Sequence, residues 1–137
     1  MSVTGMFLKA NEVRLVTLLG SRTDHELVVS NINKLILIKN PSQSDVVQFG
    51  AAISRYCAEN NVKQIVVNRR ATSGQAAGGA GTFLMEGIIL ALATVKVDSV
   101  HAATVRATDK KASEFKGIKP KTVDLGKAYD LAFEFLM

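Results

Sequence analysis

The chain opens with two segments, 3–10 and 12–19, that are predicted to be extended, with a polar turn at Asn11 between them. In the second segment, Val13, Leu15, Thr17 and Leu19 alternate with Glu12, Arg14 and Val16. A period of two is typical of a β-strand with one face buried. The second strand is expected to have one more polar face.

A third strand is expected after these two. Segment 25–30 or segment 34–38 can supply it, or the two can form one bent strand. Pro41 ends this extended region, because proline lacks the backbone N–H that a strand ladder needs.

Apolar residues recur at helical spacing in three later segments. A helix capped by Ser42 or Ser44 is predicted to run to Glu59. Thr82 and Thr122 are the predicted N-caps of two further helices. Segments 64–68 and 97–102 are predicted to be strands. Segment 104–115 is predicted to be a short helix or an irregular segment.

The predicted order is three strands, helix, strand, helix, strand, helix. The first three strands can form an antiparallel meander, whereas strands that alternate with helices lie parallel. The β-branched run 65–67 favours a central strand that is covered on both faces. We therefore predict one α/β domain over residues 1–137, with a mixed five-stranded sheet and helices on both faces.

The most distinctive stretch follows strand 64–68, where two arginines and a loop of small residues lead into an apolar helix. Glycines reach dihedral angles that other residues avoid, and the free N–H groups of a helix start attract anions. This coincidence predicts a phosphate-binding site. The alternative is a tight structural connection with its arginines in solvent. The predicted phosphate-binding residues are Arg69, Arg70, Ser73, Gly74, Gly78, Gly79, Gly81 and Thr82.

Two common nucleotide-binding motifs are absent from this loop. A P-loop needs a lysine after its second glycine, but Gly79 is followed by Ala80 and Gly81. The Gly-x-Gly-x-x-Gly fingerprint fails because Leu84 stands in place of the third glycine. ATP and NAD are therefore not expected, and no cofactor is predicted.

Charge and composition narrow the class of partner. The formal net charge is +5 and the pI is about 9.5, so nucleic acid or another polyanion is an expected partner. Lys110, Lys111 and segment 116–121 form a local basic cluster, which we interpret as a solvated loop. Cys57 is the only cysteine and is predicted to be a packed thiol. Without a membrane-length apolar segment or a signal-peptide pattern, the chain is expected in the cytoplasm.

Three stretches carry a resemblance that covers almost the full length: GMFLKANEVRLVTL, VKQIVVNRRATSGQAAGGAGTFLMEGII and KAYDLAFEFL. With them the chain resembles a family of short uncharacterised bacterial proteins, a domain of unknown function. The order of elements and the opening sequence also resemble the ribonuclease H-like fold. Among proteins of that fold, the chain resembles the RuvC-type Holliday-junction resolvases. The family resemblance implies a fold and no established activity.

The resemblance to resolvases implies metal ions held by carboxylates on the first strand, at the end of the central strand and on the last helix. In this chain, Phe7 stands at the first position, and the second falls at Val67 or Asn68. Asp130 matches the third position. One acid is too few for a site that needs about three or four, so the usual two-metal nuclease chemistry is not expected.

Three hypotheses follow. The first is a non-catalytic ribonuclease H-like module that binds phosphate groups, of nucleic acid or of another phosphate-bearing ligand, through residues 69–81. Contacts to the backbone are expected rather than base stacking, because most aromatic residues fall on apolar stripes. The second is a homodimeric interaction protein without a nucleic-acid ligand, in which the glycine loop permits close packing. The third is a nuclease with a relocated acidic site, in which Asp130 joins Glu12 or Glu86 and Mg or Mn is the cofactor. A membrane partner is not expected.

Overall fold

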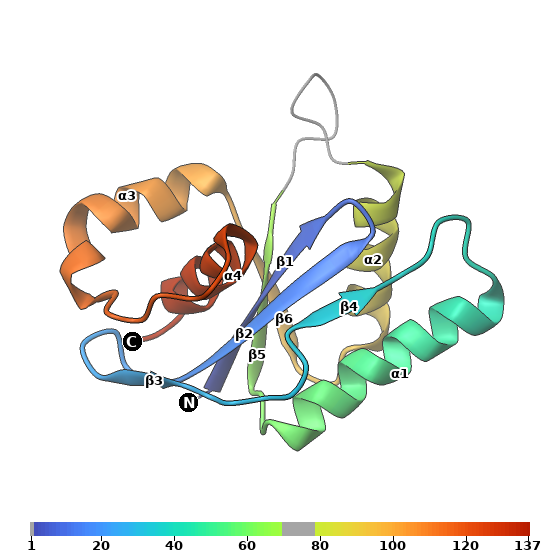
Figure 1. Cartoon of the computed structure of the whole chain (residues 1–137), viewed down its shortest axis with the longest axis horizontal. Coiled ribbons are helices and arrows are strands. Elements are labelled where there is room, and N and C mark those ends of the chain that lie inside the picture. Colours follow the sequence, from blue (N-terminus) through green and yellow to red (C-terminus); the bar gives the residue numbers. More distant parts are fainter. Residues whose placement is uncertain (1, 70–78) are drawn as a thin grey trace.

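The structure is a computed structural model, and it describes residues 2–69 and 79–137. Strands come first in the chain, and helices then alternate with strands (Figure 1). In order, the elements are β1 (Ser2–Lys9), β2 (Glu12–Gly20), β3 (His25–Leu27), β4 (Lys34–Ile36), α1 (Gln43–Glu59), β5 (Gln64–Asn68), α2 (Ala80–Leu92), β6 (Lys96–Val100), α3 (Ala102–Ala112), the 3-10 helix η1 (Ser113–Phe115) and α4 (Val123–Glu134).

The strands form one mixed sheet in the order β3-β2-β1-β5-β6, with β4 also paired to β2. β1 and β2 form an antiparallel hairpin, whereas β1, β5 and β6 run parallel. The predicted mixed sheet is therefore confirmed.

The predicted third strand is two strands, so the described part of the chain contributes six strands to the sheet rather than five. β3 pairs with the end of β2, and β4 pairs with its beginning. Between them the chain leaves the ladder over the polar stretch that contains Ser30 and Asn31.

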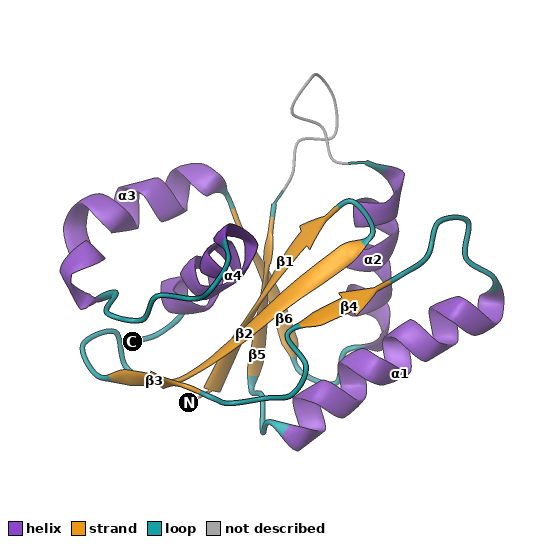
Figure 2. Ribbon diagram, viewed as in Figure 1, coloured by secondary structure: helices purple, strands orange, loops and turns teal. Residues whose placement is uncertain are grey.

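Helices α1 and α2 cover one face of the sheet (Figure 2). Their apolar sides pack on the side chains of β1, β2 and β5 that point to this face, among them Met6, Leu15 and Ile65. Cys57 of α1 is buried in this core, and burial raises the pKa of its thiol to about 11. The prediction of a packed thiol is confirmed.

Helix α4 covers the other face, and α3 lies beside α4. Val3, Val16 and Val66 of the sheet pack here against the apolar side of α4. The contact between β1 and α4 is close because Gly5 has no side chain: a Cβ at this position would lie 1.8 Å from the carbonyl oxygen of Ala128. Helices on both faces were predicted and are confirmed.

The helix starts follow local capping chemistry. Ser42 caps α1 in a capping box with Asp45, and Thr122 caps α4 through the N–H of Leu125, as predicted. The predicted N-cap at Thr82 is wrong, because α2 begins at Ala80 with Gly79 as its N-cap. The Thr82 hydroxyl instead donates to the Gly79 carbonyl. Within the described residues, no helix is both long and apolar enough to cross a membrane.

Candidate functional site: a basic pocket at the strand ends

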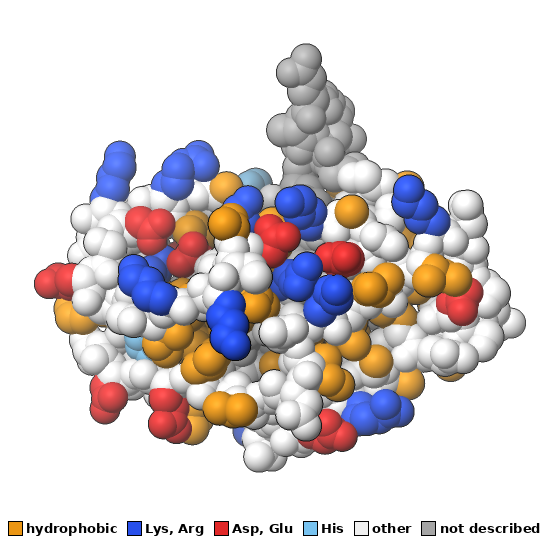
Figure 3. Space-filling model, viewed as in Figure 1, with side chains coloured by type: hydrophobic (Ala, Val, Ile, Leu, Met, Phe, Trp, Pro, Cys, Tyr) orange, Lys and Arg blue, Asp and Glu red, His pale blue; other side chains and the backbone are white. Residues whose placement is uncertain are grey.

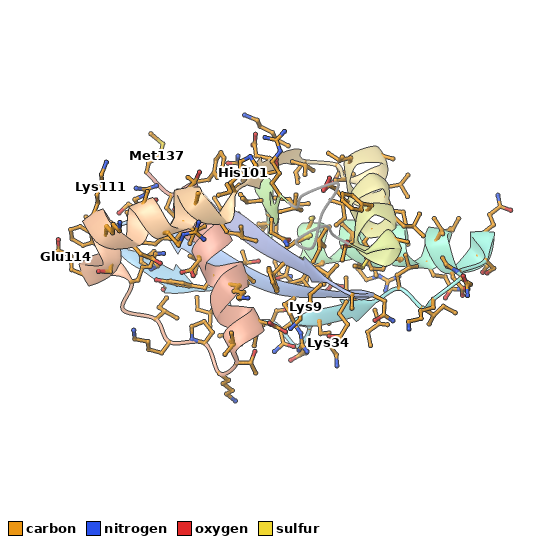
Figure 4. All side chains as sticks on the ribbon, turned by 90° about the horizontal axis from the view of Figure 1, so that it is seen from above. Lys9, Lys34, His101, Lys111, Glu114 and Met137 are labelled. Atoms are coloured by element: carbon orange, nitrogen blue, oxygen red, sulfur yellow. The ribbon has the colours of Figure 1, made fainter. Side chains whose placement is uncertain are left out.

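The carboxyl ends of the parallel strands β1, β5 and β6 meet at one edge of the sheet, which Figure 4 shows from above. A pocket of about 330 Å³ lies at this edge, between the strand ends and helices α3 and α4. His101, labelled in Figure 4, lies directly before α3 beside this pocket. The lining residues are Phe7, Asn68, Arg69, Val100, Ala102, Val105, Arg106, Asp109, Lys127, Asp130 and Leu131.

Phe7 and Asn68 stand at the ends of β1 and β5. The parallel register pairs Met6 with Val67, so Phe7 and Asn68 follow side by side. The Asn68 amide accepts a hydrogen bond from the N–H of Leu8 at 2.8 Å and donates one to the Leu8 carbonyl at 3.1 Å. A side chain thus continues the pairing of the two strands, and neither strand end brings a carboxylate into the pocket.

Lys116, on the connection between α3 and α4, binds both acidic side chains of the pocket. Its Nζ donates to Asp109 of α3 at 2.5 Å and to Asp130 of α4 at 2.9 Å. The Lys116 side chain is 9% exposed, so the interpretation of this residue as part of a solvated loop is wrong. Burial lowers the pKa of Lys116, but the bonds to Asp109 and Asp130 raise it by more, so the amine is held in its charged form.

Three cations come from three different elements around the same pocket. Arg69 follows β5 and is exposed, and its backbone N–H bonds the Val100 carbonyl at 2.9 Å. Arg106 projects from α3 and Lys127 from α4. Four cationic side chains, these three and Lys116, face two carboxylates, so the net charge at the pocket is positive and the arrangement suits an anion.

The structure separates the residues that the sequence grouped into one phosphate-binding loop. Arg69 lines the basic pocket, whereas Gly79 and Gly81 line a different, largely apolar hollow beside the β1–β2 turn. Thr82 is buried. The other predicted residues, Arg70, Ser73, Gly74 and Gly78, lie outside the described part of the chain.

The three candidate acids of a relocated nuclease site belong to different surroundings. Asp130 binds Lys116, Glu12 lies 3.2 Å from Arg14 at the start of β2, and Glu86 belongs to α2 on the opposite face of the sheet. Among the residues that the structure describes, no three His, Cys, Asp or Glu side chains gather to hold a metal ion.

Sequence reasoning missed Arg106, Lys116 and Lys127. Each comes from a different segment, and their convergence depends on the packing of α3 and α4. One signal was present in the sequence: Lys127 precedes Asp130 by three residues, so both lie on one side of the last helix.

The fold is similar to solved structures of DNA-processing enzymes. RuvC from Thermus thermophilus matches with a TM-score of 0.76 and 14% identity, over 97% of this chain and 92% of RuvC. RuvC of the same organism in complex with a Holliday junction substrate gives a TM-score of 0.74 at 14% identity, over 97% and 90% of the two chains. The Fowlpox virus resolvase, in a complex with Holliday junction DNA, gives 0.52 at 10% identity, over 98% and 97%.

These similarities establish the fold alone. The sequence identities are too low to transfer an activity. Comparison with curated proteins gave no match. A family model described as a protein of unknown function, DUF3010, matches residues 1–135. The chain, whose fold is the ribonuclease H-like fold of RuvC, therefore belongs to the DUF3010 family.

Proposed function

We propose that this protein is a non-catalytic ribonuclease H-like module that binds phosphate groups of a nucleic-acid backbone at the basic pocket. One observation carries the proposal: Phe7 and Asn68, rather than carboxylates, stand near the strand ends, and Lys116 binds both Asp109 and Asp130. The pocket therefore presents cations that can bind an anion, but it presents no free cluster of carboxylates that could bind a metal ion.

The mode of binding follows from the kind of contact. Arginine and lysine side chains that meet phosphate oxygens fix position and carry no sequence information. Lys and Arg side chains outnumber the Asp and Glu side chains that lie between them on the upper part of the face shown in Figure 3. An extended backbone laid across this face would meet charge beyond the pocket, and we expect binding without sequence preference.

The test is fluorescence anisotropy with a labelled duplex, a branched junction and a single strand at low salt. Arg69→Ala/Arg106→Ala should weaken binding roughly 10- to 100-fold, because two charge-assisted contacts are lost. Arg55→Ala/Lys63→Ala is the matched control, since it removes the same charge from exposed residues of α1 and of the opposite end of β5. This control should bind as the wild type does.

Equal losses in the two double variants would contradict the proposal, as would the absence of binding by the wild type at low salt. One arm of the experiment contains magnesium or manganese. Cleavage of the DNA in that arm would favour the nuclease with a relocated acidic site instead.

A second candidate function is homodimerisation through α2, and the exposed side of this helix favours it. Leu84 and Leu90 are 41% and 59% exposed, and Ala80, Gly87 and Ala91 are exposed beside them. Exposed apolar surface of this kind marks interaction sites. The exposed side has no charged residue, so two copies, each with a net charge of +5, can meet here without opposing like charges.

Light scattering over a concentration series tests this second function. The wild type should have the mass of a dimer, and Leu84→Lys/Leu90→Lys should have the mass of a monomer. Val123→Lys, at an exposed residue of α4, is the control and should remain dimeric. A wild type that is monomeric at all concentrations would exclude this function.

A further inference from the structure

The basic pocket has two kinds of lining. Arg69, Arg106 and Lys127 supply charge, whereas much of the rest is apolar and comes from Phe7, Val100, Ala102, Val105 and Leu131. A phosphate group needs the charged part and gains nothing from the apolar part, because apolar neighbours do not replace the water that an anion loses. The lining as a whole fits a ligand with an anionic end and a flat apolar portion.

Phe7 gives this apolar wall an aromatic face. Phe7 is half-buried and packs against the core on the α4 side, and it also lines the pocket, where Nζ of Lys127 lies 5.1 Å from the ring centroid. Stacking of a nucleic-acid base on an aromatic side chain contributes roughly 1–3 kcal/mol. Base stacking at this ring was not expected from the sequence, because the exposure of Phe7 depends on the packing of α4.

The size and the hydrogen bonds of the pocket narrow the ligand further. A volume of about 330 Å³ lies at the lower end of the range of roughly 300–1,000 Å³ that small-molecule pockets span. Such a volume suits one nucleotide unit. The Asn68 amide is bonded to Leu8, and Lys116 binds both carboxylates, so these groups are engaged within the protein and are not presented to read a base edge.

We propose that the pocket receives one unpaired nucleotide, with its base on Phe7 and its phosphate against Arg69, Arg106 and Lys127. The inference rests on the proposed function and extends it from the backbone to the base. Stacking without contacts to the base edge tolerates any base. The ligand is an unpaired nucleotide of a polynucleotide, at a strand end or a branch point, or a free nucleoside monophosphate.

The test uses 2-aminopurine, an adenine analogue whose fluorescence changes when it stacks. The probes are a single strand with 2-aminopurine at its end, a blunt duplex with the analogue paired inside it, and 2-aminopurine nucleoside monophosphate. With the full chain, emission should change for the single strand and stay constant for the duplex, although both bind. If the emission of the monophosphate changes as much as that of the single strand, the pocket binds free nucleotides. If the emission changes only for the single strand, the pocket binds polynucleotides.

Phe7→Leu keeps an apolar side chain and removes the aromatic face. It should weaken single-strand binding by about 5- to 100-fold and weaken duplex binding less, because a paired base does not stack on the ring. Phe115→Leu is the matched control, because Phe115 is an exposed aromatic residue outside the pocket, and it should have no effect. Should Phe7→Leu fail to fold, Val105→Asp introduces a like charge against the phosphate from the α3 side and should lower single-strand affinity in the same way.

Constant emission with all three probes, together with equal single-strand affinity in the wild type and the pocket variants, would overturn the inference. Duplex binding that still depends on Arg69 and Arg106 in that case would leave the proposed function intact. Absence of binding by every probe at low salt would overturn both.

Discussion

At the scale of single residues, Lys116 determines the charge of the pocket. Its amine joins Asp109 and Asp130, and it lies 4.9 Å from the centroid of the Phe133 ring in the core beneath α4. Without this amine, two carboxylates from α3 and α4 would face each other across the pocket and repel an anion. The lysine therefore connects the stability of this corner of the fold with the phosphate binding that we propose.

We predict that Lys116→Met lowers the free energy of unfolding by about 1–3 kcal/mol. Loss of one partner from a fully buried ion pair costs about 3–5 kcal/mol, and the value here is smaller because both carboxylates keep contact with water. Urea unfolding measures the change. Lys119→Met, at an exposed residue of the same connection, is the control and should leave the midpoint in place. Equal stability of the wild type and Lys116→Met would show that the bridge contributes nothing.

The same variant has a predicted pH dependence. The pKa of Lys116 in the folded chain lies above its ordinary value of about 10.4, because the bonds to Asp109 and Asp130 outweigh the effect of burial. A proton held more tightly in the folded state stabilises the fold fully below the unfolded pKa, and this contribution is lost as pH rises through the folded pKa. The stability difference between wild type and Lys116→Met should be constant from about pH 7 to 9 and shrink above roughly pH 10.4. A difference that grows above pH 10.4 would have the wrong sign.

At the scale of elements, the contact between β1 and α4 fixes the position of the pocket, because these two elements carry Phe7, Lys127 and Asp130. Gly5 permits this contact. Gly5→Ala would place a methyl group against the Ala128 backbone, where neither a strand nor a helix can yield easily. We predict a loss of about 3 kcal/mol or more in calorimetry or urea unfolding.

Gly126→Ala is the control for that variant. Gly126 lies inside α4, and a Cβ there would meet no described atom within 4 Å. Alanine should therefore stabilise the helix by about 0.5–1 kcal/mol. A Gly5→Ala protein as stable as the wild type would mean that α4 lies farther from β1 than the structure places it.

Most elements were predictable because their signals are local. The alternation in 12–19 gave β2, and the side-chain oxygens of Ser42 and Thr122 marked two helix starts. The predicted start of α2 was wrong, because its N-cap residue Gly79 has no capping side chain that would mark it in the sequence. The division of the third strand was left open, since two segments of three residues each carry too little pattern.

At the scale of the whole molecule, the candidate site was only partly predictable. Phe7 and Asp130, which the resemblance to resolvases singled out, and Arg69, which follows a central strand, all line the basic pocket. The contributions of Arg106, Lys116 and Lys127 could not be read from the sequence, because they depend on how α3 and α4 settle on the sheet. The net charge of +5 predicted an anionic partner but not the place where it binds.

The most direct test of the central claim, that the pocket binds phosphate through its cations, is the salt dependence of binding to a labelled branched DNA junction. The logarithm of the binding constant is plotted against the logarithm of the salt concentration for the wild type, Arg69→Ala/Arg106→Ala and Arg55→Ala/Lys63→Ala. Each phosphate contact contributes about 0.9 to the slope on duplex DNA. We predict a slope for Arg69→Ala/Arg106→Ala that is shallower by up to about two, and a control slope equal to that of the wild type. Three equal slopes would contradict the account.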